Sequence, residues 1–181
     1  MAHICPWWHA YFFDNWFRRI LYRPEKLFGP YVREGMTVAD IGCGMGFNAI
    51  ALARMVGEDG RVIAVDVQNK MLDVLRKRAA RAGLAARIEP RQTQPDSIGI
   101  DTEVGFVVAF WSVHEIPDAA RFMQQVRSCL APGGNLLVVE PRSRVSAEEF
   151  QATLALANDV GLEVHDGPRL PFSRSAVLHR P

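Results

Sequence analysis

The sequence predicts an α/β sandwich, in which a mostly parallel sheet of seven strands lies between two layers of helices. Apolar runs of strand length alternate along the chain with amphipathic segments of helix length, an order typical of parallel sheets. The last two strand-like runs are separated only by a short turn, so they must pair antiparallel or not at all. With 181 residues, of which 49% are hydrophobic, the chain is expected to form one domain with a substantial core.

The predicted elements follow one another in a regular order. Strands are expected at residues 38–41, 61–67, 86–91, 104–110 and 136–141, and helices at residues 47–56, 69–82, 118–130 and 146–160. Gly83 is expected to end the second helix, while Ser146 and Glu149 have the spacing of a capping box that starts the fourth. Residues 162–165 and 176–179 form the predicted closing hairpin.

The most informative stretch joins the first strand to the first helix, residues 40–46 (DIGCGMG). Its three glycines lack a Cβ atom, so the backbone can turn tightly and its amides can approach a ligand. The dinucleotide fingerprint G-x-G-x-x-G would require a glycine at position 47, where this chain has Phe47. The spacing therefore disfavours a nicotinamide-dependent dehydrogenase.

An acidic residue stands at the expected distance from this loop. Asp66 ends the second predicted strand, 20 residues beyond Gly46. Ligands of parallel α/β sheets bind outside the carboxyl ends of the strands, so Asp66 would lie beside the glycine loop. A carboxylate there can accept two hydrogen bonds from ribose hydroxyls.

The loop resembles the D/E-x-G-x-G-x-G turn of class I S-adenosylmethionine-dependent methyltransferases. Residues 110–118 (FWSVHEIPD) resemble the segment after strand four in that family, and residues 130–134 (LAPGG) resemble its turn before strand five. The resemblance covers residues 35–179. It implies a Rossmann-like three-layer sandwich with an antiparallel C-terminal hairpin, in which a cofactor-binding core, residues 35–181, carries an N-terminal helical cap, residues 1–34. The implied activity is methyl transfer to a small molecule, with S-adenosylhomocysteine as the other product.

The resemblance also implies a set of cofactor-binding residues. The methionine part would be held by the loop, the end of strand four and the N-terminal helix, namely by Asp40, Gly42, Cys43, Gly44, Gly46, Phe110 and Tyr11. Asp66 would bind the ribose, and Val67 would lie against the adenine. Gln94 or Asp96 would accept a hydrogen bond from the adenine amine.

The segment after the fourth predicted strand supplies the candidate acceptor site. A methyl group on a sulfonium needs an aligned nucleophile and the exclusion of water, and a base where the nucleophile carries a proton. His114 is the candidate base and Glu115 the second choice; the alternative is that His114 caps or fills the start of the next helix. Trp111 is a candidate wall of the site, and Trp7 and Trp8 are expected to face the substrate.

The N-terminal segment carries an aromatic stripe at helical spacing that includes Trp8, Tyr11 and Trp16. A helix there would cover the cofactor, pack on the sheet, or lie on a membrane surface. His3, Cys5 and His9 lack a fourth ligand and a matching spacing, so no metal is expected.

Composition restricts the remaining possibilities. A net charge of +1 argues against a bulk electrostatic grip on nucleic acid. Three cysteines with no paired spacing, no leader and no run of 18 apolar residues predict a cytoplasmic protein. A non-catalytic S-adenosylmethionine-binding or membrane-associated regulator stays open as an alternative.

Overall fold

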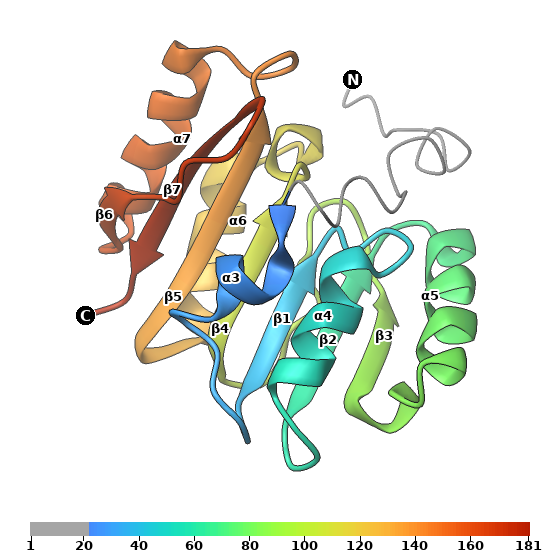
Figure 1. Ribbon diagram of the computed structural model, residues 1–181. Coiled ribbons are helices and arrows are strands. Elements are labelled where there is room, and N and C mark those ends of the chain that lie inside the picture. Colours follow the sequence, from blue (N-terminus) through green and yellow to red (C-terminus); the bar gives the residue numbers. More distant parts are fainter. Residues whose placement is uncertain (1–21) are drawn as a thin grey trace.

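The computed structural model describes residues 22–181, which form a seven-stranded sheet with helices on both faces (Figure 1). The strands run β1 Thr37–Ile41, β2 Arg61–Asp66, β3 Ile88–Gln92, β4 Val104–Phe110, β5 Leu130–Pro141, β6 Glu163–Asp166 and β7 Ser173–His179. Their order in the sheet is β3-β2-β1-β4-β5-β7-β6, and β7 pairs antiparallel with both of its neighbours. The predicted mostly parallel sheet with an antiparallel C-terminal hairpin is therefore confirmed.

Two helical layers cover the sheet. The helices are α3 Pro24–Phe28, α4 Phe47–Met55, α5 Asn69–Arg81, α6 Ala119–Cys129 and α7 Ala147–Asp159, with 3₁₀ turns η1 Ala85–Arg87 and η2 Val113–Glu115. Figure 1 shows α3 and α4 in front of the sheet and α6 behind it. Parallel strands buried on both faces need apolar residues on both faces, and successive strand residues indeed enter opposite clusters.

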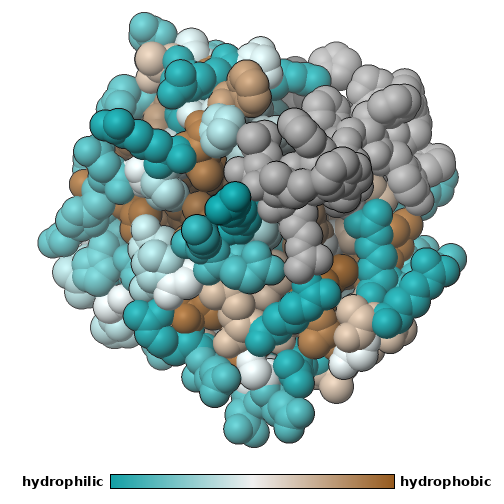
Figure 2. All heavy atoms as spheres, in the orientation of Figure 1, coloured by the Kyte–Doolittle hydropathy of each residue, from teal (hydrophilic) through white to brown (hydrophobic). Residues whose placement is uncertain are grey.

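The two clusters form a continuous core on either side of the sheet. Val38 and Phe106 pack with the side chains of α3, α4 and α5, whereas Ala39 and Val107 pack with those of α6 and α7. On the face shown in Figure 2, hydrophilic side chains surround scattered apolar patches of the described part of the chain. The described helices therefore turn their apolar sides inward.

The helix boundaries follow the predicted signals. Ser146 Oγ accepts a hydrogen bond from the Glu149 amide at 3.1 Å, and Glu149 Oε2 accepts one from the Ser146 amide at 2.8 Å. This is the capping box expected at the start of α7. Gly83, with a φ of 70°, ends α5 as predicted.

Two strand boundaries differ from the prediction. The third strand begins at Ile88 because residues 85–87 form a 3₁₀ turn. The fifth begins at Leu130, so the expected turn at residues 132–134 lies within the strand, where the pairing with β4 shifts register between Val104 and Phe106. A Cβ atom on Gly134 would lie 2.8 Å from the Ala131 carbonyl oxygen, so this irregular segment requires a glycine.

Much of the predicted N-terminal cap lies outside the described residues, among them Trp7, Trp8 and Tyr11. In the described part of the cap, residues 22–34, the side chains of Tyr22, Leu27, Phe28 and Val32 belong to the apolar cluster with α4 and α5. Within residues 22–181, no helix is both long enough and apolar enough to cross a membrane.

Candidate functional site

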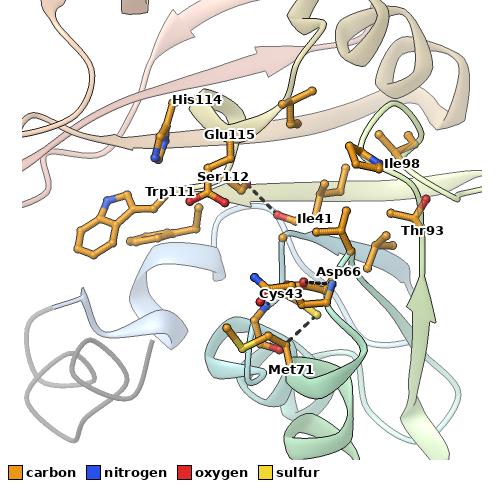
Figure 3. Close-up of a pocket in the computed structure, with 18 of the residues that line it drawn as sticks. Ile41, Cys43, Asp66, Met71, Thr93, Ile98, Trp111, Ser112, His114 and Glu115 are labelled. Atoms are coloured by element: carbon orange, nitrogen blue, oxygen red, sulfur yellow. Dashed lines mark hydrogen bonds between the residues drawn. The ribbon is translucent and has the colours of Figure 1, made fainter. Parts of the chain in front are cut away.

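The carboxyl ends of β1, β2 and β4 border a cavity of about 670 Å³, a size typical of small-molecule sites. The order of the sheet reverses between β1 and β4, which is where α/β sheets open a crevice for ligands. Figure 3 shows Cys43, Asp66 and Met71 on one side of this cavity, and Trp111, Ser112, His114 and Glu115 on another. Thr93 and Ile98 lie on a third side.

The glycine loop uses each of its glycines differently. Gly42, Gly44 and Gly46 all have positive φ, at 70°, 52° and 89°. A Cβ atom on Gly42 would lie 2.5 Å from the Ser112 Cβ, and one on Gly46 would overlap Leu75. Gly44 lines the cavity, and apart from Gly44 itself and its two chain neighbours no described residue has a heavy atom within 4 Å of a Cβ placed there. The middle of the loop is therefore an open cradle toward the cavity, and the amides of Gly42, Cys43, Gly44 and Gly46 hold its shape by donating to the Val65 carbonyl, Asp66 and the Cys43 carbonyl.

Asp66 ties the end of β2 to this cradle. Its Oδ2 accepts a hydrogen bond from the Gly44 amide at 2.9 Å, and its Oδ1 accepts one from the Gln68 amide at 2.8 Å. Burial raises the pKa of Asp66, while the Gln68 and Gly44 amides act in the opposite direction. A carboxylate oxygen is able to accept two hydrogen bonds, so Asp66 can order the loop and still bind hydroxyls.

Two further residues lie close to the loop. Asp40 is completely buried on β1, and Cys43 is 6% exposed. Burial raises the pKa of the Cys43 thiol well above its usual value, and the charges of Asp40 and Asp66 raise it further. Cys43 is therefore a protonated thiol that fills space, as expected for an unreactive cysteine.

The candidate adenine side is lined by Val67, Gln94 and Asp96. Gln94 and Asp96 are exposed, and Asp96 forms an ion pair with Arg121 at 3.3 Å. Gln125 orders this segment, because its side chain accepts from the Ile98 amide at 2.9 Å and donates to the Asp96 carbonyl at 3.0 Å.

The sequence interpretation missed the buried apolar walls Met71 and Ile98, both 5% exposed. The spacing of Met71 in its helix fits a core residue as well as a cavity wall, and Ile98 lies in an irregular segment whose sequence has no periodicity. A second missed residue is Asn48, which lines the cavity and is 6% exposed. Its amide oxygen has no hydrogen-bond partner among residues 22–181, which suits contact with a polar ligand.

Trp111 follows Phe110 at the end of β4 and has a φ of 59°, a left-handed backbone that is unusual for a bulky residue. Its amide donates to the Val139 carbonyl at 2.7 Å, and its indole Nε1 donates to Ser173 Oγ at 3.1 Å. The ring meets Tyr22 edge-on, with a centroid separation of 5.7 Å. Contacts from β5, β7 and the N-terminal side thus place Trp111 at the cavity.

The turn after Trp111 is fixed from two neighbouring strands. Ser112 Oγ donates to the Ile41 carbonyl at 2.9 Å. Glu140, at the end of β5 and only 2% exposed, accepts from the Val113 amide through Oε1 at 2.9 Å. Its Oε2 lies 2.5 Å from His114 Nδ1. The hydrogen bond to Glu140 raises the pKa of His114, and partial burial of the ring opposes this.

His114 is not the cap of the following helix. The cap of α6 is Asp118, whose Oδ1 accepts from the Arg121 amide at 2.9 Å. The His114 side chain is 20% exposed and lines the cavity, and Glu115 lines it beside His114. The structure thus brings both candidate catalytic residues to the cavity that the glycine loop borders.

Glu140 and Ser173 were missed from the sequence. Glu140 ends the apolar strand at residues 136–141, so the rule that identified Asp66, an acid at the carboxyl end of a parallel strand, could have found it. Ser173 carries no such signal, because only the pairing of β7 with β5 brings it to Trp111.

The class I fold of S-adenosylmethionine-dependent methyltransferases has a parallel sheet covered by helices on both faces and closed by one antiparallel strand. This chain has that sheet, with a glycine loop after β1 and an acid at the end of β2. Residues 38–134 match the family model described as a methyltransferase domain, which is more than half of the chain. The chain belongs to that family.

Named relatives and solved structures agree with this assignment. The chain is 29% identical over 110 residues to the ubiquinone/menaquinone biosynthesis C-methyltransferase UbiE of Enterobacter sp. (strain 638), covering 60% of this chain and 44% of the relative. It is 32% identical over 124 residues to the enzyme of the same name from Marinomonas sp. (strain MWYL1), covering 66% and 49%. The matched part thus spans about half the length of these relatives.

Two solved structures match along almost the whole chain. A SAM-dependent methyltransferase from Aquifex aeolicus has a TM-score of 0.84 and 25% identity, covering 97% of this chain and 98% of that one. A putative S-adenosyl-L-methionine-dependent methyltransferase from Methanococcus maripaludis has a TM-score of 0.77 and 19% identity, covering 99% and 97%. At this identity the second match shows the fold alone.

Proposed function

We propose that this chain transfers a methyl group from S-adenosylmethionine to a small-molecule acceptor. The observation that carries the proposal is one cavity with two different sides. The open cradle at Gly44 and the buried Asp66 form one side, and His114 with Trp111 forms another. A binding site with a candidate proton acceptor is what methyl transfer to a protonated nucleophile requires.

The residues of the cradle suit the cofactor. Asp40 and the backbone of Gly42, Cys43, Gly44 and Gly46 would hold the methionine part, together with the Phe110 carbonyl. Asp66 would bind the ribose, Val67 would contact the adenine, and Gln94 or Asp96 would meet its amine. When bound, S-adenosylmethionine would supply an electrophilic methyl group on its sulfonium.

The residues on the other side would handle the acceptor. Trp111 would present an aromatic wall toward the cationic centre, an attraction worth about 0.5 to 2 kcal/mol. His114 would take a proton from the acceptor, with Glu115 as the second candidate. Trp7, Trp8 and Tyr11 keep their expected roles in an N-terminal cap, residues 1–34, over a core of residues 35–181.

Two observations support a small acceptor. Among residues 22–181, the longest connection between elements is residues 93–103, so the described part of the chain adds no separate domain for a large folded substrate. The relatives named above act, by their names, in ubiquinone and menaquinone biosynthesis. We also propose a cytoplasmic location, which the free thiols of Cys43 and Cys129 fit.

Calorimetry with S-adenosylmethionine, S-adenosylhomocysteine and NAD tests the cofactor. We expect the first two to bind and NAD not to bind. Radiolabelled S-adenosylmethionine is then incubated with the protein and a cell extract separated into small-molecule, protein and nucleic-acid fractions. Label in the small-molecule fraction supports the proposal, whereas label only in protein or nucleic acid contradicts a small acceptor. NAD binding without S-adenosylmethionine binding contradicts the proposed reaction altogether.

A further inference from the structure

We propose that Glu140 is a positioning residue that holds the His114 ring with its proton on Nδ1, so that Nε2 is the atom that takes the proton of the acceptor. The inference rests on the methyl transfer proposed above. As the acceptor atom bonds to the methyl carbon, the donor sulfur keeps the electron pair of the broken bond. The proton lost by the acceptor passes to Nε2 and then to water.

The geometry of Glu140 points to this role. Its carboxylate is buried at the end of β5, with 2% of the residue exposed. Oε1 accepts from the Val113 amide at 2.9 Å, and Oε2 lies 2.5 Å from His114 Nδ1. One carboxylate therefore fixes both the backbone of the turn and the side chain that follows it. A buried carboxylate of this kind is tolerated because both of its oxygens are paired.

The chemistry of the pair selects one tautomer of the ring. An ionised carboxylate can only accept hydrogen bonds, so the nitrogen facing it must carry the hydrogen. In the neutral ring the other nitrogen, Nε2, then has the lone pair and is the only ring atom able to take a proton. Carboxylate–histidine pairs in hydrolases orient the ring in the same way.

Charges from three segments act on His114. Glu140 faces the ring from β5, Glu115 belongs to the same 3₁₀ turn, and Arg144 lies in the segment after β5. Glu140 and Glu115 raise the pKa of His114, and Arg144 and burial lower it; the net shift is upward. Below that raised pKa the ring is an imidazolium without a lone pair. The methyl-transfer rate should therefore rise with pH, with an inflection above the ordinary histidine value of about 6.5.

The tautomer can be measured without any acceptor. Nitrogen NMR of the ¹⁵N-histidine-labelled full chain, with the His114 signals assigned by their loss in His114→Gln, distinguishes protonated from unprotonated ring nitrogens. In the wild type, the neutral His114 ring should carry its hydrogen on Nδ1. A neutral ring protonated on Nε2 overturns the proposal, and this result requires no change at Glu140.

Glu140→Gln is the matched variant. Its carboxamide oxygen can still accept from the Val113 amide, while its NH₂ group can donate to Nδ1. The hydrogen of the neutral ring should therefore move to Nε2, and the inflection should fall toward the ordinary value. An unchanged tautomer and an unchanged inflection in a folded Glu140→Gln protein contradict the proposed role.

Activity gives an independent measurement. Glu140→Gln should lower kcat by about 10²- to 10⁴-fold, because the wrong tautomer faces the acceptor, with S-adenosylmethionine affinity unchanged. Adding Glu140→Gln to His114→Gln should cause no further loss, because Glu140 acts through the ring. Glu163→Gln is the control, since Glu163 lies 3.8 Å from His165 in an exposed pair on β6.

The two proposals fail in distinguishable ways. If the wild type binds S-adenosylmethionine but labels no acceptor, the proposed function fails and the NMR result still decides the tautomer. If the wild type methylates an acceptor and folded Glu140→Gln matches it in rate and pH profile, only the role of Glu140 is refuted.

Discussion

The two sides of the cavity are built from different parts of the chain. The cofactor side consists of the glycine loop, residues 42–46, and Asp66, and the bond between Gly44 and Asp66 joins residues 22 positions apart. The acceptor side consists of residues 111–115 with Glu140 and Ser173, and its bonds span up to 71 positions. The cofactor side is mainly a glycine-rich backbone loop, whereas the acceptor side presents side chains held by distant strands.

This difference explains what each side can tolerate. The cofactor side depends on a contiguous glycine pattern, because Gly42, Gly44 and Gly46 all have positive φ and a Cβ atom on Gly42 or Gly46 would overlap a neighbour. Side chains on separate strand ends can change one at a time, so the acceptor side can be adapted to a new acceptor. The sides meet where Gly42 lies against Ser112.

The largest expected effect is a loss of methyl-transfer rate without a loss of cofactor affinity, produced by a change on the acceptor side alone. His114→Ala should lower the methyl-transfer rate by about 10²- to 10⁴-fold, the range for losing one positioned proton acceptor. The affinity for S-adenosylmethionine should not change, because His114 lies on the acceptor side. Single-turnover kinetics and calorimetry measure the two quantities, and His165→Ala is the control. A rate per folded molecule equal to the wild type would mean that His114 only supports packing.

Asp66→Ala should act on the cofactor side alone. Hydrogen bonds to a charged group contribute about 1.5 to 3 kcal/mol each, so losing two should weaken S-adenosylmethionine binding at least about a hundredfold. The Gly44 and Gln68 amides also lose their shared acceptor. Calorimetry checks this, with Asp73→Ala, an exposed residue of α5, as the control. A titration that overlays the wild type would refute the ribose assignment.

Gly42→Ala and Gly44→Ala test the junction between the two sides. Both residues have positive φ, so alanine should cost about 1 to 2 kcal/mol of unfolding free energy at either position. At Gly42 the new Cβ would also lie 2.5 Å from the Ser112 Cβ. This overlap should add about 1 to 3 kcal/mol. Urea denaturation measures both variants, and equal losses would mean that Ser112 moves aside freely.

The smallest expected effect is the dependence of stability on pH. The pKa of His114 is higher in the folded than in the unfolded chain, so its pairing with Glu140 stabilises the protein fully below the unfolded pKa of about 6.5. That contribution is lost as the pH rises through the folded pKa. The difference in unfolding free energy between the wild type and His114→Ala should therefore shrink with rising pH. A constant difference would show that the pair does not couple to protonation.

The same contrast separates what the sequence predicts from what it does not. The glycine loop, the position of Asp66 beside it, the capping box of α7 and the closing hairpin depend on local patterns, and the structure contains all four. The rule that identified Asp66, an acid at the carboxyl end of a parallel strand, would also have identified Glu140. The contact between Trp111 and Ser173 could not be predicted in this way, because the register of β7 on β5 depends on the packed sheet and not on any local pattern.

The irregular start of β5 was also not predicted, because it depends on pairing within the sheet. The segment Leu130 to Gly134 contains the proline and two glycines of a turn, which local chemistry favours. In the structure it pairs with β4 across a register shift, because Gly134 has no Cβ to strike the Ala131 and Gly105 carbonyl oxygens. Sheet pairing here overrides the local preference.

The bond from Trp111 to Ser173 also bears on the order in which the molecule is assembled. A chain is synthesised from its N-terminus, so the glycine loop and Asp66 emerge well before Ser173. In the folded chain β7 lies between β5 and β6, so the hydrogen bond from the Trp111 indole to Ser173 requires this last strand to be paired with β5. The residues of the glycine loop are thus synthesised early, whereas the acceptor side is complete only after β7 has emerged.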